Sequence, residues 1–126
     1  MLTVALVLAG LAALVHVYIF WLESLAFPTA GRKAFGIGAE DAAVMRPWAF
    51  NQGFYNLFLA AVTAAGIAMV SSDRHASVAL VVAGVGSMLA AALVLVGSDP
   101  GKARGALVQG LFPALALVSL ALWAWT

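Results

Sequence analysis

Residues 77–96 read SVALVVAGVGSMLAAALVLV, and no charged side chain interrupts them. An α-helix of about 20 apolar residues is long enough to cross a hydrocarbon layer about 30 Å thick. The rest of the chain has the same character, because 65% of its 126 residues are hydrophobic and only 9% are charged. Soluble domains contain about 45–50% apolar and about 25% charged residues. The composition therefore predicts an integral membrane protein whose main partner is the lipid bilayer.

Three more apolar segments flank this one along the chain. The predicted helices cover about residues 2–27, 47–70, 77–96 and 105–125, within a single domain that spans residues 1–126. Because helices joined by short turns lie antiparallel, the expected fold is all-α: a polytopic membrane protein with an antiparallel bundle of four transmembrane helices. The first segment is expected to stay in the mature protein, since no basic region precedes it as in a signal peptide.

The longest polar interval, residues 28–46, is predicted to be a surface loop. Within it, residues 40–45 are expected to start a brief amphipathic helix lying on the headgroups, and Trp48 fits the aromatic belt at the membrane interface. Pro47 suits the first turn of the next span, where its missing N–H needs no partner.

Basic residues are shared unequally between the two sides of the predicted bundle. The second loop holds only Arg74, and neither terminus has a Lys or Arg. The first and third loops, which share one side, hold Arg32, Lys33, Arg46, Lys102 and Arg104. Since cytoplasmic loops carry the excess of basic residues, the first and third loops are predicted to be cytoplasmic and both termini to lie outside.

Charge and composition exclude several classes of function. A formal net charge of +1 without any run of Lys or Arg argues against nucleic-acid binding. The chain has no cysteine, which excludes disulfides and thiolate chemistry. His16 and Glu23 are too far apart along a helix for the usual metal-binding pair, so no metal site is predicted. No cofactor or phosphate-binding motif is present, so no cofactor is expected.

Polar side chains stand out against this apolar background. Residues 51–56 read NQGFYN and place four hydrogen-bonding side chains at the start of a predicted span. With a rise of 1.5 Å per residue and antiparallel helices, these groups and the polar groups of the other spans fall in the same cytoplasmic half. Because an unpartnered polar group in lipid is costly, they are expected to face one another around a ligand-binding pocket. The predicted pocket residues are His16, Glu23, Asn51, Gln52, Tyr55, Asn56 and Gln109.

Each member of this cluster also has a simpler interpretation. The amides serve equally well as hydrogen-bonding contacts between helices. Glu23 is close enough to the end of its helix to be an interfacial carboxylate that reaches solvent, and His16 suits a hydrogen-bonded packing residue. A cluster that is closed, dry and self-paired would contradict a pocket.

Several segments taken together resemble a known family. They are residues 16–23 (HVYIFWLE), residues 51–56 (NQGFYN), Gln109-Gly110 and residues 113–115 (PAL). The combination resembles the small bacterial membrane proteins catalogued as domain of unknown function 1304, over nearly the whole chain. The resemblance implies a compact four-span protein of the bacterial inner membrane and assigns no catalytic residue.

Three hypotheses for the function follow. The leading one is a polar pocket on the cytoplasmic side that binds or transports a small or amphipathic molecule. The second is a membrane-embedded enzyme of the isomerase type, in which Glu23 and His16 act as acid and base on a lipid-soluble substrate. The third is a structural bundle whose polar groups only pack. Since 126 residues are few for a transporter acting alone, a homo-oligomer is expected, with Gly84 and Gly86 in its contact face.

Overall fold

Four long helices account for most of the chain in this computed structural model, which describes residues 1–126. They are α1 (Leu2–Phe20), α3 (Ala39–Ala68), α4 (Arg74–Ser98) and α5 (Ala103–Ala124). Short helical segments join them: η1 (Trp21–Leu25), η2 (Phe27–Gly31) and α2 (Arg32–Ala34) lie between α1 and α3, and η3 (Pro100–Lys102) lies between α4 and α5. The predicted all-α fold is confirmed, since the chain contains no strand.

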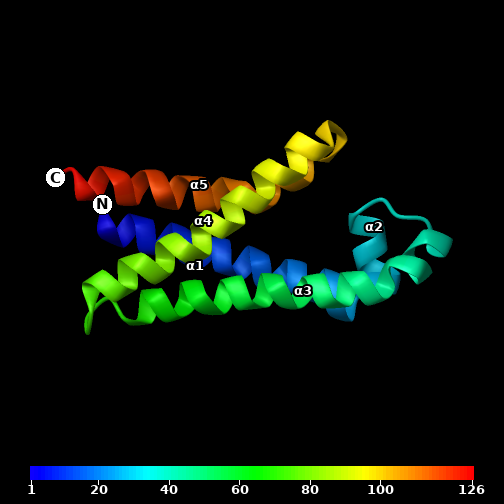
Figure 1. The fold of residues 1–126 in the computed structure, drawn as a ribbon, viewed down its shortest axis with the longest axis horizontal. Helices are drawn as coiled ribbons and strands as arrows, with labels where there is room; N and C mark the ends of the chain where they lie inside the picture. Colours follow the sequence, from blue (N-terminus) through cyan, green and yellow to red (C-terminus); the bar gives the residue numbers. More distant parts are fainter.

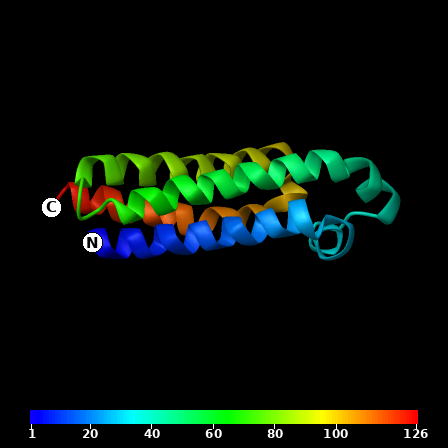
Figure 2. The same ribbon diagram turned by 90° about the horizontal axis from the view of Figure 1, so that it is seen from below.

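The long helices pack side by side along the long axis of the molecule. Helix α1 packs against α3 and α5, and α4 packs against the same two helices from the other side. Figures 1 and 2 show both termini and the α3–α4 turn at one end, with α2 and the α4–α5 turn at the other. We call the second end the cap end. The N-terminal part of α3 extends beyond the α4–α5 turn there.

Small side chains on α1 allow this close packing. Ala5, Ala9 and Ala12 are completely buried against a core that α4 and α5 complete. The remaining core residues are Val81, Val85, Met88, Ala116 and Leu120. Alanines at intervals of three and four share one helix face and let a neighbouring backbone approach, which is how helices commonly associate in lipid.

Three helical segments are long and apolar enough to cross a membrane. They are Leu2–Leu25, Arg74–Ser98 and Pro100–Ala124, as expected for a membrane protein. The longest helix, α3, does not meet the same criterion, although it has 30 residues. Its first turns carry charged side chains, including Glu40, Asp41 and Arg46.

The region predicted as a loop, residues 28–46, is mostly helical. Gly38 has an extended backbone (φ −65°, ψ 158°), and α3 begins directly after it, eight residues before the predicted start at residue 47. Glu40 and Asp41 lie in the first turn, where negative charge suits the helix dipole. Pro47 therefore lies inside the helix rather than in its first turn. The carbonyl of Ala43, which Pro47 leaves without a backbone donor, belongs to an exposed stretch and can reach water.

The end of α1 also differs from the predicted regular helix to residue 27. After Phe20 the chain forms two π-helical turns, in which Ala26 N–H donates to the carbonyl of Trp21 and Gly31 N–H donates to the carbonyl of Ala26, both at 2.8 Å. Pro28 stands near the start of the second turn, where its missing N–H costs little. A side chain at Gly31 would overlap the carbonyl oxygen of Leu22, so this tight turn requires glycine.

Gly84 lies in a packing contact within the molecule, not in a contact between subunits. A methyl group on it would lie 3.2 Å from both the Cβ and the backbone nitrogen of Thr63 on α3. The prediction that Gly84 helps form a contact face between subunits is therefore wrong, because α3 already covers it. Gly86 has no heavy atom within 4 Å of such a methyl group and remains open.

Candidate functional site

A hydrogen bond between Glu23 and Asn56 lies at the centre of the predicted cluster. Asn56 Nδ2 donates to Glu23 Oε2 over 2.8 Å, and it makes a longer contact of 3.4 Å to the carbonyl of Gln52. Asn56 is buried, whereas Glu23 is half-buried in the π-helical turn η1. The predicted meeting of these two side chains is confirmed. Single π-turns are frequent at functional sites, and this one sets the direction in which Glu23 points.

Gly53 brings α3 close enough for this bond to form. A methyl group on it would lie 3.1 Å from Glu23 Cβ and 3.1 Å from the carbonyl oxygen of Phe20, and it would overlap the hydroxyl of Ser24. That hydroxyl donates to the carbonyl of Phe50 over 2.8 Å. The end of α1 and the middle of α3 are therefore joined by two hydrogen bonds on either side of a glycine contact. We call this contact, formed by Glu23, Ser24, Phe50, Gly53 and Asn56, the Glu23–Asn56 junction.

Three of the predicted pocket residues point away from this junction. The side chains of Asn51, Gln52 and Tyr55 are exposed, and the Tyr55 ring lies against Phe58 on its own helix. The prediction that they face into an enclosed cluster is wrong. The Gly53 and Asn56 contacts fix the rotation of α3, and residues one or two positions away then point outward. Near the end of a span, such side chains can reach headgroups or water.

His16 and Gln109 are not hydrogen-bonded to the junction either. His16 is only 1% exposed, and its Nδ1 lies 2.9 Å from the carbonyl oxygen of Ala12 in its own helix. This is the packing role considered above as the simpler interpretation. Gln109 is half-buried on α5, and its side chain makes no hydrogen bond within the protein. No hydrogen bond links His16 to Glu23.

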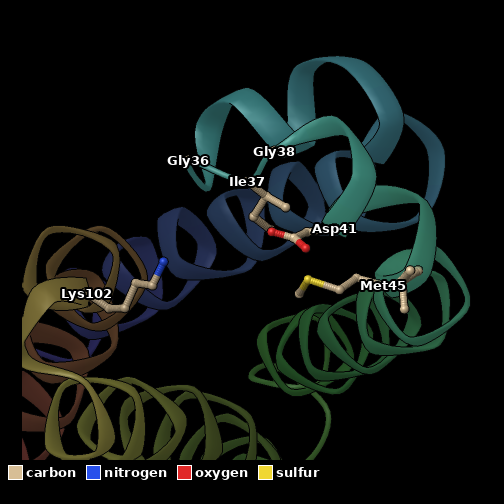
Figure 3. Close-up of a pocket in the computed structure, with 7 residues that line it drawn as sticks. Gly36, Ile37, Gly38, Asp41, Met45 and Lys102 are labelled. Carbon is tan, nitrogen blue, oxygen red and sulfur yellow. The ribbon is translucent and has the colours of Figure 1, made fainter.

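A pocket of about 420 Å³ lies at the cap end, outside the predicted cluster. We call it the cap pocket; its lining comes from the α2–α3 turn, the first turns of α3 and η3. The lining residues are Gly36, Ile37, Gly38, Asp41, Val44, Met45 and Lys102. Figure 3 shows Lys102 on one side of the pocket and Asp41 and Met45 on the other.

A smaller pocket of about 150 Å³ lies between η2, α2 and another side of the same part of α3. We call it the arginine pocket, after Arg32 and Arg46 in its lining. The other lining residues are Pro28, Ala39, Ala42 and Ala43. The two pockets share no lining residue, and neither is lined by a residue of the predicted cluster.

Neither pocket follows from the sequence, because the pattern of residues 28–46 predicts a surface loop with only a brief helix at residues 40–45. One signal was nevertheless available. The antiparallel topology places the loop around Lys102 at the same end as residues 28–46, which include the oppositely charged Asp41. What the sequence did not reveal is that a folded segment of α3 faces the α4–α5 turn.

A family model described as a protein of unknown function (DUF1304) matches residues 10–121. The chain belongs to this family. The resemblance inferred from the sequence is thereby confirmed, and the match covers the Glu23–Asn56 junction and both pockets of this DUF1304 protein. Neither a curated protein nor a solved structure matches the chain. The family brings no activity with it, so the function of the DUF1304 protein has to be argued from its own residues.

Proposed function

We propose that this DUF1304 protein is a four-span protein of the bacterial inner membrane that binds an amphipathic molecule in the cap pocket, at the cytoplasmic headgroup layer. The observation that carries the proposal is the lining of that pocket. It combines a carboxylate, an ammonium group and three apolar side chains: Asp41, Lys102, Ile37, Val44 and Met45.

The position of the pocket along the helices supports an interfacial ligand. Lys102 ends η3, where the apolar segments of α4 and α5 meet, so it lies where two spans leave the hydrocarbon layer. Trp48 on α3 is 81% exposed, as suits an aromatic side chain in the interfacial belt. About 20 residues of α3 follow it, enough for a fourth crossing.

The lining chemistry defines the class of ligand. A volume of about 420 Å³ lies within the range of about 300–1,000 Å³ that is typical of small-molecule sites. Asp41 suits a ligand ammonium group, and Lys102 suits a phosphate or carboxylate. Apolar contacts to Ile37, Val44 and Met45 would take the start of a hydrocarbon chain. A zwitterionic amphiphile satisfies all three features.

The Glu23–Asn56 junction has a positioning role in this proposal. It fixes the end of α1 to α3 at Asn56, about four helical turns along α3 from Asp41. Loosening the junction would change the angle of α3 and the distance between Asp41 and Lys102. The self-contained bonds of His16 and Asn56 favour this packing role over acid–base chemistry.

The test is native mass spectrometry of the protein in nanodiscs formed directly from cell membranes. The wild-type protein is expected to carry an amphiphile that Asp41→Asn and Lys102→Gln both lose. Glu40→Gln and Lys33→Gln are matched controls, because both residues are exposed at the same end and line neither pocket. A wild-type protein without any adduct, or equal occupancy in all five proteins, would refute the proposal.

A further inference from the structure

We propose that the arginine pocket is a binding site for a phosphate group. It does not depend on the ligand of the cap pocket, since the two pockets have no residue in common. Arg32, at the start of α2, and Arg46, on α3, both line it, and no carboxylate does. Two arginine residues from separate elements thus line one small space that no acidic residue lines.

Arg32 is held in place before any ligand binds. Its Nε donates to the carbonyl of Pro28 over 3.2 Å, and its Nη1 lies 3.5 Å from the carbonyl oxygen of Ile37. These contacts occupy Nε and Nη1 and leave Nη2 without a protein acceptor. A fixed donor loses little side-chain entropy on binding, which is the advantage of a preorganised site.

Small side chains on α3 leave the space that the ligand would fill. Ala39, Ala42 and Ala43 line the pocket on the helix side, and Arg46 follows Ala42 and Ala43 at intervals of four and three. The volume of about 150 Å³ corresponds to about five water molecules. This is enough for a phosphate group with its nearest atoms and too little for a nucleotide.

The chemistry of the lining suits an oxyanion such as phosphate. Guanidinium groups present paired N–H donors that match the oxygen atoms of phosphate, and bonds between charged partners are shorter and stronger than neutral ones. The pocket lies at the cap end, which is predicted to face the cytoplasm, so two sources supply this group: a phospholipid headgroup in the inner leaflet, or a soluble phosphate.

The experiment measures thermal unfolding of the whole protein and separates the two sources. In one arm, inorganic phosphate is added to protein in a phosphate-free, lipid-free detergent. In the other, the protein is placed in nanodiscs of a phosphate-free glycosyl diacylglycerol, with or without phosphatidic acid, so that the host lipid supplies no phosphate group. Arg46→Gln is the principal variant, because Arg32 also holds the backbone of the turn. Arg104→Gln is the control, being exposed at the same end and outside both pockets.

A phosphate-dependent rise in unfolding temperature in detergent, lost in Arg46→Gln and kept in Arg104→Gln, would support the proposal with a soluble ligand. The same pattern only with phosphatidic acid would support it with a lipid headgroup. In either arm the apparent affinity of Arg46→Gln is expected to fall about tenfold or more, with Arg46→Lys in between because it keeps the charge but loses the paired donors. Equal shifts in the wild type and Arg46→Gln, or no shift in either arm, would overturn it.

Discussion

Replacement of Gly53 by alanine is expected to destabilise the protein, although alanine is the better helix former. The added methyl group would overlap the Ser24 hydroxyl and lie 3.1 Å from both Glu23 Cβ and the carbonyl oxygen of Phe20. The backbone of the π-helical turn fixes Glu23 Cβ and the carbonyl oxygen of Phe20, so α3 must move away. Gly86→Ala is the matched control, because its methyl group would meet nothing within 4 Å.

The expected magnitude follows from three effects. Overpacking a close contact costs about 1–3 kcal/mol. Displacing the Ser24 hydroxyl from the carbonyl of Phe50 costs about 1 kcal/mol. Against these, glycine to alanine inside a helix gains up to about 1 kcal/mol. Gly53→Ala should therefore lower the free energy of unfolding by about 2 kcal/mol, whereas Gly86→Ala should leave it unchanged or raise it by up to about 1 kcal/mol.

The assay is unfolding of the protein in mixed micelles by increasing amounts of SDS, followed by far-UV circular dichroism. The double variant Ser24→Ala/Gly53→Ala adds a second check. Removing the hydroxyl takes away the closest overlap, so the double variant should lose less stability than the sum of the two single variants. If Gly53→Ala is as stable as Gly86→Ala, the close approach of α3 to the end of α1 is not as described.

Three further predictions concern other parts of the molecule. Asn56→Ala should lower the free energy of unfolding by about 1–3 kcal/mol, because it removes the hydrogen bond to Glu23 and leaves a half-buried carboxylate oxygen unpaired; the same SDS titration measures it. Ser77→Ala should be neutral or stabilising by about 1 kcal/mol in that titration, since the buried Ser77 hydroxyl has no hydrogen-bond partner and its removal leaves nothing unpaired. Lys33→Cys and Ser72→Cys, in a chain without native cysteine, should react with a membrane-impermeant thiol reagent from opposite sides of sealed vesicles, Lys33→Cys from the cytoplasmic side; labelling of both from one side would contradict the proposed crossings.

The helices could be predicted from the sequence because their signals are strong and local. α4 differs from the predicted 77–96 by only two or three residues at each end, and α5 is similarly close to 105–125. The π-helical turns after Phe20 could not be predicted, since they depend on how tightly Gly31 and Gly53 let separate parts of the chain approach. The start of α3 does not follow from the sequence, because Pro47 is typical of the first turn of a helix; in the structure the exposed carbonyls before it make it tolerable within the helix.

Only part of the candidate site can be predicted, because the height of a residue along the bundle follows from sequence spacing, whereas the rotation of a helix about its axis does not. Spacing along antiparallel helices brings Glu23 and Asn56 to the same height, which is enough to predict that they meet. Whether Asn51, Gln52 and Tyr55 join them depends on the rotation of α3 about its axis, and that rotation is set by the Gly53 contact rather than by any pattern of hydrophobicity.

The length of α3 links the membrane part of the molecule to its pockets. In the proposed four-span arrangement a crossing needs about 20 residues, and α3 has 30, so about two to three turns would be left over at the cap end. Those extra turns carry Asp41 on the side of the cap pocket and Arg46 on the side of the arginine pocket. Because α3 forms a wall of both pockets and also holds Asn56 deeper in the molecule, the Glu23–Asn56 bond helps to set the position of both walls. Weakening that bond should therefore lower ligand occupancy at both pockets together, whereas Asp41→Asn and Arg46→Gln should each affect only its own pocket.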